Sequence, residues 1–228
     1  FEPIIWVDKK DVLLRRLFPD LIFKSLYSHG RFLSENNDAF LMKKKLHGKN
    51  LFSIIVDDYR LAKIWEKRLK GRSNRLVALD DENARSHDCD ILIDAKWEGD
   101  NTKYRYTEKI NRRCLKLLGP QFFLLPKMYE SETPFESKCA SLSSAFTITI
   151  NIGGSGDWNK YILLIRRLLS IFGTVPNLMI CPIVGPLSSG VELLTTLSSH
   201  HSQIQIVWRP KGLYGTLKRT NLFITAAG

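Results

Sequence analysis

Short runs of apolar, mostly β-branched residues recur along the first half of the chain and end in acidic residues. They are PIIWVD (3–8), FSIIVDD (52–58), RLVALDD (75–81) and DILIDA (90–95). Continuous apolar runs of this kind are typical of parallel strands that are covered on both faces. Helical patterns lie between them, at 37–48, where we expect an Asn or Asp cap, and at 59–71, which ends at Gly71. Strands that alternate with helices in this way predict a doubly wound α/β domain.

The same alternation returns near the end of the chain. AFTITINI (145–152) is the next expected strand, and Ile162, Ile165, Leu169 and Phe172 share one face of the helix that follows it. Further strands are expected at 177–184, 202–208 and 221–228, with a helix at 190–201.

A stretch rich in Ser and Glu, MYESETPFESKCASLSS (128–144), has no apolar periodicity and indicates a linker. We therefore expect an N-terminal Rossmann-like lobe over 1–128, a linker over 129–144 and a C-terminal Rossmann-like lobe over 145–228. The segment 145–228 is short for a domain whose sheet is covered by helices on both faces. At the other end, the pattern of PIIWVD is that of a strand preceded by another strand and a helix. We expect a chain that is incomplete at both ends.

The composition fits an ordinary globular protein of 228 residues, with 44% hydrophobic and 25% charged residues. No apolar run approaches the roughly 18–20 residues that a membrane span needs, and the first residues lack the order of a signal peptide. The sequence therefore predicts a cytoplasmic protein. Its formal charge of +11 favours an anionic partner, but the basic residues are scattered and no nucleic-acid signature accompanies them. We expect no nucleic-acid partner, and the oligomeric state stays open.

Neither the cysteines nor the histidines form a recognisable site. No close pair occurs among the four cysteines, so reduced structural thiols and no metal site are expected. No histidine stands in a nucleophile motif, and the polar surroundings predict a surface position for each. The residues are Cys89, Cys114, Cys139 and Cys181, and His29, His47, His87, His200 and His201.

Acidic residues follow the predicted strands at Asp57-Asp58-Tyr59, Asp80-Asp81-Glu82 and Asp94. Two interpretations stay open for them. Strand-end aspartates often cap the next helix or turn. Ligands of parallel α/β sheets also bind beyond the carboxyl ends of strands, where such side chains contact sugar hydroxyls or hold a water. An Asp pair alone offers too few oxygens for Mg²⁺.

The glycine-rich turn Gly153-Gly154-Ser155-Gly156 stands between a predicted strand and a predicted helix. Glycines allow backbone N–H groups to approach an anion closely, and a helix N-terminus adds positive potential. The turn matches neither GxGxxG nor a Walker loop. A phosphate cradle and a simple turn both fit, and Ser155 or Asp157 can cap the helix in either case.

Several segments, taken in order, resemble the PseG/SpsG family of UDP-sugar hydrolases. They are IIVDDYRLAKIWEKRLK, LVALDDENARSHDCDILIDA, CLKLLGPQFFLLPKMY, ITINIGGSGDWNK and LFITAAG. The resemblance implies a two-lobed fold like that of the GT-B glycosyltransferases, with UDP bound mostly by the C-terminal lobe. It implies hydrolysis of the anomeric C–O bond with inversion. The substrate would be a UDP-2,4-diacetamido-trideoxyhexose of pseudaminic acid or related nonulosonic acid biosynthesis, and no cofactor would be needed.

The resemblance also assigns substrate-binding residues by position. Gly153, Gly154 and Ser155 would approach the diphosphate, Ala227 and Gly228 would meet the nucleotide, and Asp58 with Tyr59 would face the sugar. The family's GxGHxxR loop, which carries the expected catalytic histidine, does not occur within 1–228, so no catalytic residue is assigned. Two alternatives stay open, a GT-B glycosyltransferase that uses a UDP-sugar donor and a nucleotide-sugar-binding protein without turnover. The exact sugar and its stereochemistry stay open too.

Overall fold

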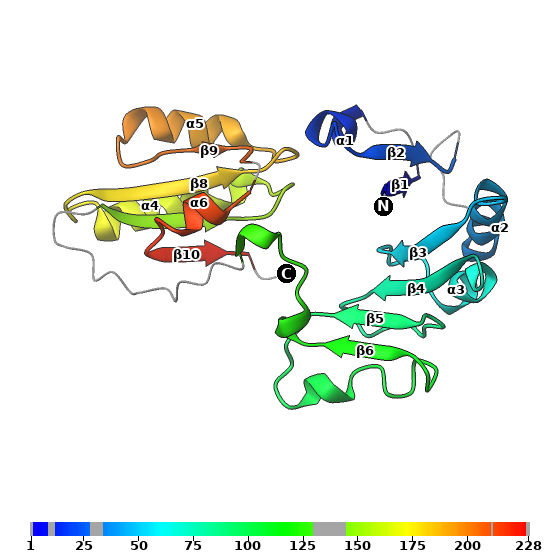
Figure 1. Cartoon of the computed structure of the whole chain (residues 1–228). Helices are drawn as coiled ribbons and strands as arrows, with labels where there is room; N and C mark the ends of the chain where they lie inside the picture. The colour runs from blue at the N-terminus through cyan, green and yellow to red at the C-terminus, as the bar shows by residue number, and fades with distance from the viewer. Residues whose placement is uncertain (1, 9–11, 28–33, 130–144, 211, 227–228) are drawn as a thin grey trace. The chain divides into compact units, whose positions relative to one another are not determined.

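A computed structural model of the chain describes residues 2–8, 12–27, 34–129, 145–210 and 212–226 (Figure 1). The chain divides into two compact units, Phe1–Leu124 and Leu125–Gly228, called unit 1 and unit 2 below. The predicted linker over 129–144 lies, apart from Tyr129, outside the described residues.

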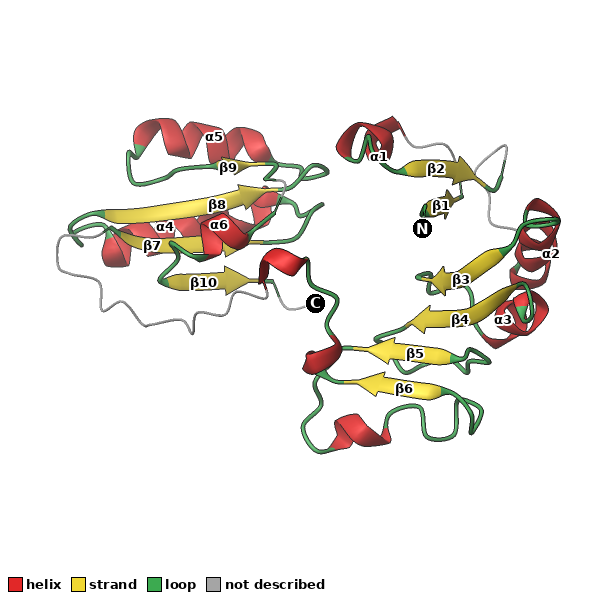
Figure 2. Cartoon of the chain, in the orientation of Figure 1, coloured by secondary structure: helices red, strands yellow, loops and turns green. Residues whose placement is uncertain are grey.

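Unit 1 is built around a parallel sheet in the order β3-β4-β5-β6 (Figure 2). Its strands are β3 (Leu51–Val56), β4 (Ser73–Leu79), β5 (Ile91–Asp94) and β6 (Leu115–Leu118). Two further strands, β1 (Ile4–Val7) and β2 (Ile22–Ser25), form a separate parallel pair. The helices are α1 (Val12–Leu17), α2 (Glu35–Lys45) and α3 (Lys63–Leu69), with 3-10 turns η1 (Asn101–Tyr104) and η2 (Pro120–Phe122). The strands predicted at 3–8, 52–58, 75–81 and 90–95 are confirmed, with small shifts at their ends.

The core of unit 1 explains why these residues form these elements. Trp65 and Leu69, one turn apart on α3, are almost fully buried, as are Leu76 of β4 and Leu92 of β5. Because Trp65 and Leu69 stand at i and i+4, they lie on one face of α3 and pack towards the sheet.

The predicted cap of α2 is wrong. The residue that caps it is Ser34, whose hydroxyl oxygen accepts a hydrogen bond from the backbone N–H of Asn37 at 3.2 Å. The Asn and Asp that were expected at this position lie inside the first turns of the helix, which Ser34 initiates as a typical N-cap residue.

The predicted helix over 59–71 begins only at Lys63, because its first residues are held in a turn. The Asp58 carboxylate accepts from the N–H of Arg60 at 2.9 Å, which competes with helix formation. The N-cap of α3, Ala62, has no capping side chain of its own. Glu35 supplies it from α2, since its Oε1 accepts from the N–H groups of Ala62 and Trp65 at 2.9 and 2.8 Å.

Unit 2 contains a second parallel sheet, in the order β10-β7-β8-β9. Its strands are β7 (Phe146–Asn151), β8 (Leu178–Val184), β9 (Val207–Trp208) and β10 (Leu222–Thr225). Its helices are α4 (Ile162–Phe172), α5 (Val191–His200) and α6 (Tyr214–Leu217), with 3-10 turns η3 (Lys127–Tyr129) and η4 (Trp158–Tyr161). The strand predicted over 202–208 is reduced to the two residues of β9, although Ile204 forms an isolated bridge with Ile180.

The apolar face predicted for α4 packs into the core of unit 2. Ile162 and Ile165 are buried, and Leu169 and Phe172 are partly buried against the same cluster, which includes Ile148 of β7. Two mixed α/β units with parallel sheets are therefore present, as expected of Rossmann-like folds. No helix among the described residues is both long and apolar enough to cross a membrane.

Candidate functional site

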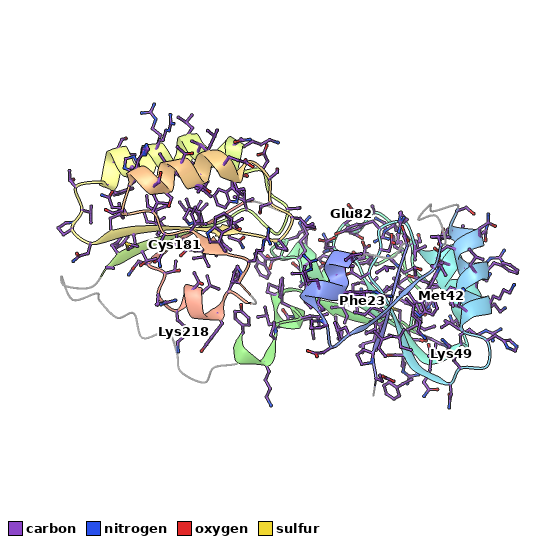
Figure 3. All side chains as sticks on the ribbon, turned by 90° about the horizontal axis from the view of Figure 1, so that it is seen from above. Phe23, Met42, Lys49, Glu82, Cys181 and Lys218 are labelled. Atoms are coloured by element: carbon purple, nitrogen blue, oxygen red, sulfur yellow. The ribbon has the colours of Figure 1, made fainter. Side chains whose placement is uncertain are left out.

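The carboxyl edge of the sheet in unit 1 carries the acidic residues that follow its strands. Asp58 comes after β3, Asp80 after β4, and Asp94 ends β5. Glu82, which is labelled in Figure 3, belongs to the same edge. In a parallel sheet this is the edge at which ligands bind, so the partners of each carboxylate decide which of them remain available.

Asp58 is held by arginine. Its Oδ1 accepts from the Nε of Arg60 at 2.9 Å and its Oδ2 lies 2.5 Å from Arg60 Nη2, while Arg60 Nη1 bridges to Asp8 at 2.6 Å. Partial burial alone would raise the pKa of Asp58, but the hydrogen bonds and charge of Arg60 outweigh burial and lower it. Asp58 is therefore a turn-forming, ion-paired carboxylate, and its partner Arg60 links the end of β3 to Asp8, the residue after β1.

Tyr59 projects outward from this edge, with 57% of its surface exposed. Its hydroxyl donates to Asp81 Oδ1 at 2.7 Å, and this bond raises the pKa of Tyr59 to about 12. The guanidinium of Arg85 lies 5.3 Å from the centroid of its ring. An exposed aromatic ring that is fixed by a hydrogen bond offers a surface for a sugar or a base.

The surface position predicted for His87 is wrong, because the residue is only 3% exposed. Its Nδ1 lies 2.6 Å from Glu66 Oε1 and its Nε2 lies 3.1 Å from Asp80 Oδ2. Burial opposes the charged ring, but the hydrogen bonds and charges of Asp80 and Glu66 outweigh it and raise the pKa of His87 to about 9. At neutral pH both ring nitrogens donate, so His87 is a buried cation and not a general base.

Asp80 is the centre of this buried network. Its carboxylate also lies 2.5 Å from Arg85 Nη2 and 3.0 Å from the hydroxyl of Tyr106. Burial would raise the pKa of Asp80, but the bonds from His87, Arg85 and Tyr106 lower it far below its usual value. Asp80 is saturated with protein donors, which indicates a structural role.

Both carboxylate oxygens of Asp94 also accept hydrogen bonds from the protein. Arg105 is 3% exposed and its Nε lies 2.5 Å from Asp94 Oδ2, while the N–H of Lys96 donates to Asp94 Oδ1 at 2.9 Å. Arg105 also donates to the carbonyl of Asp81 at 2.7 Å, which ties the loop after β4 to β5. The turn-capping interpretation of the strand-end aspartates therefore holds for Asp58 and Asp94.

The glycine turn follows β7 in unit 2 and is fastened to the loop after β8. The N–H of Leu187 donates to the carbonyl of Gly154 at 2.9 Å, and that of Ser189 donates to the carbonyl of Gly156 at 3.1 Å. Gly153 has a φ of +85°, a backbone conformation that favours glycine, and its N–H donates to Asn151 Oδ1 at 3.1 Å.

Two consecutive N–H groups of this turn, those of Gly154 and Ser155, have no acceptor among the described residues. In a trans peptide the N–H points away from the preceding carbonyl. Since the Gly154 carbonyl faces Leu187, the Ser155 N–H points away from that loop. A Cβ built on Gly154 has no heavy atom within 4 Å, so space for an approaching group lies beside it. Such N–H groups can receive an anionic oxygen.

The predicted helix does not begin directly after the glycines. Asp157 caps η4 by accepting from the N–H of Asn159 at 3.1 Å, and α4 starts only at Ile162. Asp157 therefore caps the 3-10 turn η4, whereas α4 follows Tyr161 without a side-chain cap, so the expectation that Ser155 or Asp157 caps this helix is wrong. The glycine turn does not form the first turn of α4.

Ala227 and Gly228 lie outside the described residues. The residue before them, Ala226, donates its N–H to the carbonyl of Asn151 at 3.2 Å. The chain that leads to Ala227 is thereby brought beside the residue at the end of β7, two positions before Gly153.

Sequence reasoning missed the residues that pair with Asp80 and Asp94, and the carboxylate that pairs with His87 from its other side. The partners of the aspartates are Arg85, His87, Arg105 and Tyr106, and the second partner of His87 is Glu66. Glu66 is fully buried on α3 in a stretch whose pattern is that of an ordinary amphipathic helix, so nothing local marks it. Among the described residues, no group of three or more His, Cys, Asp or Glu side chains is arranged to hold a metal ion. No family model matches the chain, and no curated protein matches it either.

Proposed function

We propose that this protein is a nucleotide-sugar hydrolase with a GT-B-like, two-lobed architecture. Water would attack the anomeric carbon of a UDP-2,4-diacetamido-trideoxyhexose, the C1–O bond would break with inversion, and UDP would leave. The observation that carries the proposal is the pair of N–H groups at Gly154 and Ser155, which have no acceptor in the described chain and follow a parallel strand. Leaving-group charge on a diphosphate needs donors that are oriented before the reaction.

Unit 1 contributes a second supporting observation. The exposed ring of Tyr59 stands at the carboxyl edge of its sheet and is fixed by Asp81, beside the ion-paired Asp58. The Tyr59 ring suits contact with a sugar, and Asp58, whose two oxygens are engaged by Arg60, holds the turn that carries this ring. The group that accepts the proton of the attacking water is not assigned to any residue, since His87 is already protonated at neutral pH.

The test of the reaction is incubation of the protein, expressed from its complete reading frame, with the UDP-2,4-diacetamido sugar. Release of UDP and free sugar without any acceptor supports hydrolysis. UDP that appears only after an acceptor is added favours a glycosyltransferase, and binding without turnover favours a nucleotide-sugar-binding protein.

The phosphate role of the glycine turn is tested by Gly154→Val. A Cβ at this position has no heavy atom within 4 Å apart from its chain neighbours, so we expect the fold to persist, while the side chain would block the approach of a diphosphate. We expect UDP affinity, measured by calorimetry, to fall by at least about tenfold, or about 1.4 kcal/mol. Gly215→Val is the matched control, because Gly215 belongs to the same unit and its Cβ also meets nothing within 4 Å. Unchanged affinity in Gly154→Val would remove the phosphate cradle.

A further inference from the structure

The outer surface of helices α2 and α3 carries positive charge that no ion pair within the described chain neutralises. The two helices pack against each other and contribute to the core of unit 1 (Figure 2). All of their basic side chains are exposed, and none forms an ion pair with a carboxylate of the described residues. These side chains are Lys43, Lys44 and Lys45 of α2, and Lys63, Lys67 and Arg68 of α3.

The carboxylates of the two helices are engaged inside unit 1. Glu35 is partly buried and accepts from two N–H groups at the start of α3. Asp38 is 3% exposed and accepts from the indole of Trp65 at 2.6 Å. Glu66 is fully buried beside His87. An approaching anion therefore meets cations and neutral groups of these helices, and no exposed carboxylate repels it.

Two large apolar side chains lie among these cations. Phe40 of α2 is 64% exposed, and Ile64 of α3 is 50% exposed. Phe40 stands one helical turn before Lys44, and Ile64 stands one turn before Arg68, so each apolar side chain shares a helix face with a cation. A single exposed apolar residue is common on protein surfaces. Two of them among cations without ion pairs give this surface an amphipathic character.

A side-chain contact joins the outer faces of the two helices. Arg68 Nε donates to Asn36 Oδ1 at 2.7 Å. Asn36, Phe40 and Lys43 stand at i, i+4 and i+7 and therefore share one stripe of α2. Ile64 and Arg68 share a stripe of α3 in the same way. Basic segments that are separate in the sequence thus form one surface. This surface, called the α2–α3 patch below, consists of Phe40, Lys43, Lys44, Ile64, Lys67 and Arg68.

We propose that the α2–α3 patch docks the protein on the surface of an anionic lipid bilayer. Each lysine near such a surface strengthens binding roughly fivefold. Apolar side chains such as Phe40 and Ile64 insert at the headgroup boundary, while lysine ammonium groups stay in water. A nucleic acid fits the patch less well, because Arg68 is engaged by Asn36 and an isoleucine cannot stack on a base as an aromatic ring does. The proposal does not rest on the proposed hydrolase activity.

Co-sedimentation of the purified protein with lipid vesicles tests the proposal. Vesicles of phosphatidylcholine mixed with phosphatidylglycerol supply the anionic surface, and vesicles of phosphatidylcholine alone are the neutral control. We expect binding to the anionic vesicles only, and weaker binding at about 0.5 M NaCl, because salt screens exposed charges. Equal binding to both kinds of vesicle, or to neither, would overturn the proposal. Binding to a DNA or RNA oligonucleotide without binding to anionic vesicles would overturn it in favour of a nucleic-acid surface.

A triple variant separates the patch from the net charge of the protein. Lys43→Gln, Lys44→Gln and Lys67→Gln together should lower the affinity for anionic vesicles by about 100-fold, from roughly fivefold per lysine. The matched control removes three exposed cations of the same unit that lie outside the patch, Lys103→Gln, Arg112→Gln and Arg113→Gln. It should keep most of the affinity. Equal losses in the two variants would mean that net charge alone drives binding and would overturn the patch.

A second variant tests the apolar contribution of the patch. Phe40→Ser combined with Ile64→Ser should lower the affinity by about tenfold at both salt concentrations, because insertion of apolar side chains is not screened by salt. Leu163→Ser combined with Ile171→Ser is the control, since these side chains of α4 are 68% and 64% exposed but belong to unit 2. The control should bind like the wild type. An equal loss in both double variants would contradict docking through α2 and α3.

Discussion

At the scale of single residues, the imidazole of His87 links the stability of unit 1 to pH. Its folded-state pKa of about 9 lies above the ordinary value of 6.5. The stabilisation is therefore complete below about pH 6.5 and is lost as the pH rises through about 9. From this difference we expect the free energy of unfolding to fall by roughly 3 kcal/mol across that window.

His87→Gln should remove this pH dependence and also destabilise unit 1, by about 3–5 kcal/mol at pH 6.5, because it leaves the buried Glu66 carboxylate without its cation and removes one of the two cations that pair with Asp80. Urea unfolding at a series of pH values measures both effects. His47→Gln, at an exposed histidine of the same unit, is the control and should keep the wild-type profile. A His87→Gln profile parallel to that of the wild type would show that the ring is not charged.

At the scale of elements, α3 depends on a cap supplied by another helix. Glu35, the first residue of α2, accepts from the N–H groups of Ala62 and Trp65 at the start of α3. Glu35→Ala should cost about 1–2 kcal/mol in unfolding free energy, as loss of a helix cap does. Lys44→Ala, an exposed position on the same helix, should stay within about 0.5 kcal/mol of the wild type. Thermal or urea unfolding distinguishes the two, and equal stabilities would exclude the shared cap.

In unit 1, the neighbouring strands β5 and β6 bring two thiols together at the ends where the strands begin. The Sγ atoms of Cys89 and Cys114, which stand just before β5 and β6, are 3.6 Å apart. Diamide should oxidise the pair to an intramolecular disulfide, with the two electrons and two protons passing to the diamide. Peptide mapping should then recover one cross-link between the segments around residues 89 and 114, and Cys114→Ser should abolish it. Free thiols at both positions after diamide treatment would contradict the proximity.

At the scale of the whole molecule, each unit has its own hydrophobic core, and the two clusters share no residue. We therefore expect their stabilities to respond separately to core mutations. Ile165→Ala should destabilise unit 2 by about 2–5 kcal/mol and accelerate exchange of β7 and β8. Exchange of β4 and β5 should be unchanged, and Leu92→Ala should give the reciprocal pattern. Acceleration in both units by either variant would mean that they unfold as one.

Much of the fold was predictable because many of its strands and helices follow from local patterns of apolar residues. The apolar runs at 52–58, 75–81 and 90–95 became β3, β4 and β5, and the face of Ile162 and Ile165 became the buried side of α4. The predicted ends of helices were wrong where a side chain makes a hydrogen bond with the backbone at that end. The start of α3 is delayed by the turn at Asp58 and depends on Glu35, which is distant in the sequence.

The candidate site was less predictable than the fold. Sequence position placed Asp58 and Tyr59 at a strand end and Gly153 to Ser155 in a turn after β7, and both placements agree with the structure. Their roles towards a nucleotide sugar remain predictions. The partners of the acidic residues were not predictable, because pairing depends on which surfaces of α3 and of the loops meet.

The sequence by itself determined the strands and helices that have a strong local pattern, since the period of apolar residues and the positions of glycine act within a few neighbouring residues. It did not predict β2, β6, α1 or α6. Only the tertiary structure decided the state of the charged groups. His87 looks like any polar loop histidine in the sequence. It becomes a buried cation because α3 and the end of β4 bring Glu66 and Asp80 to opposite sides of its ring. Desolvation and Coulomb energy depend on distances in space, which residue spacing along the chain does not fix.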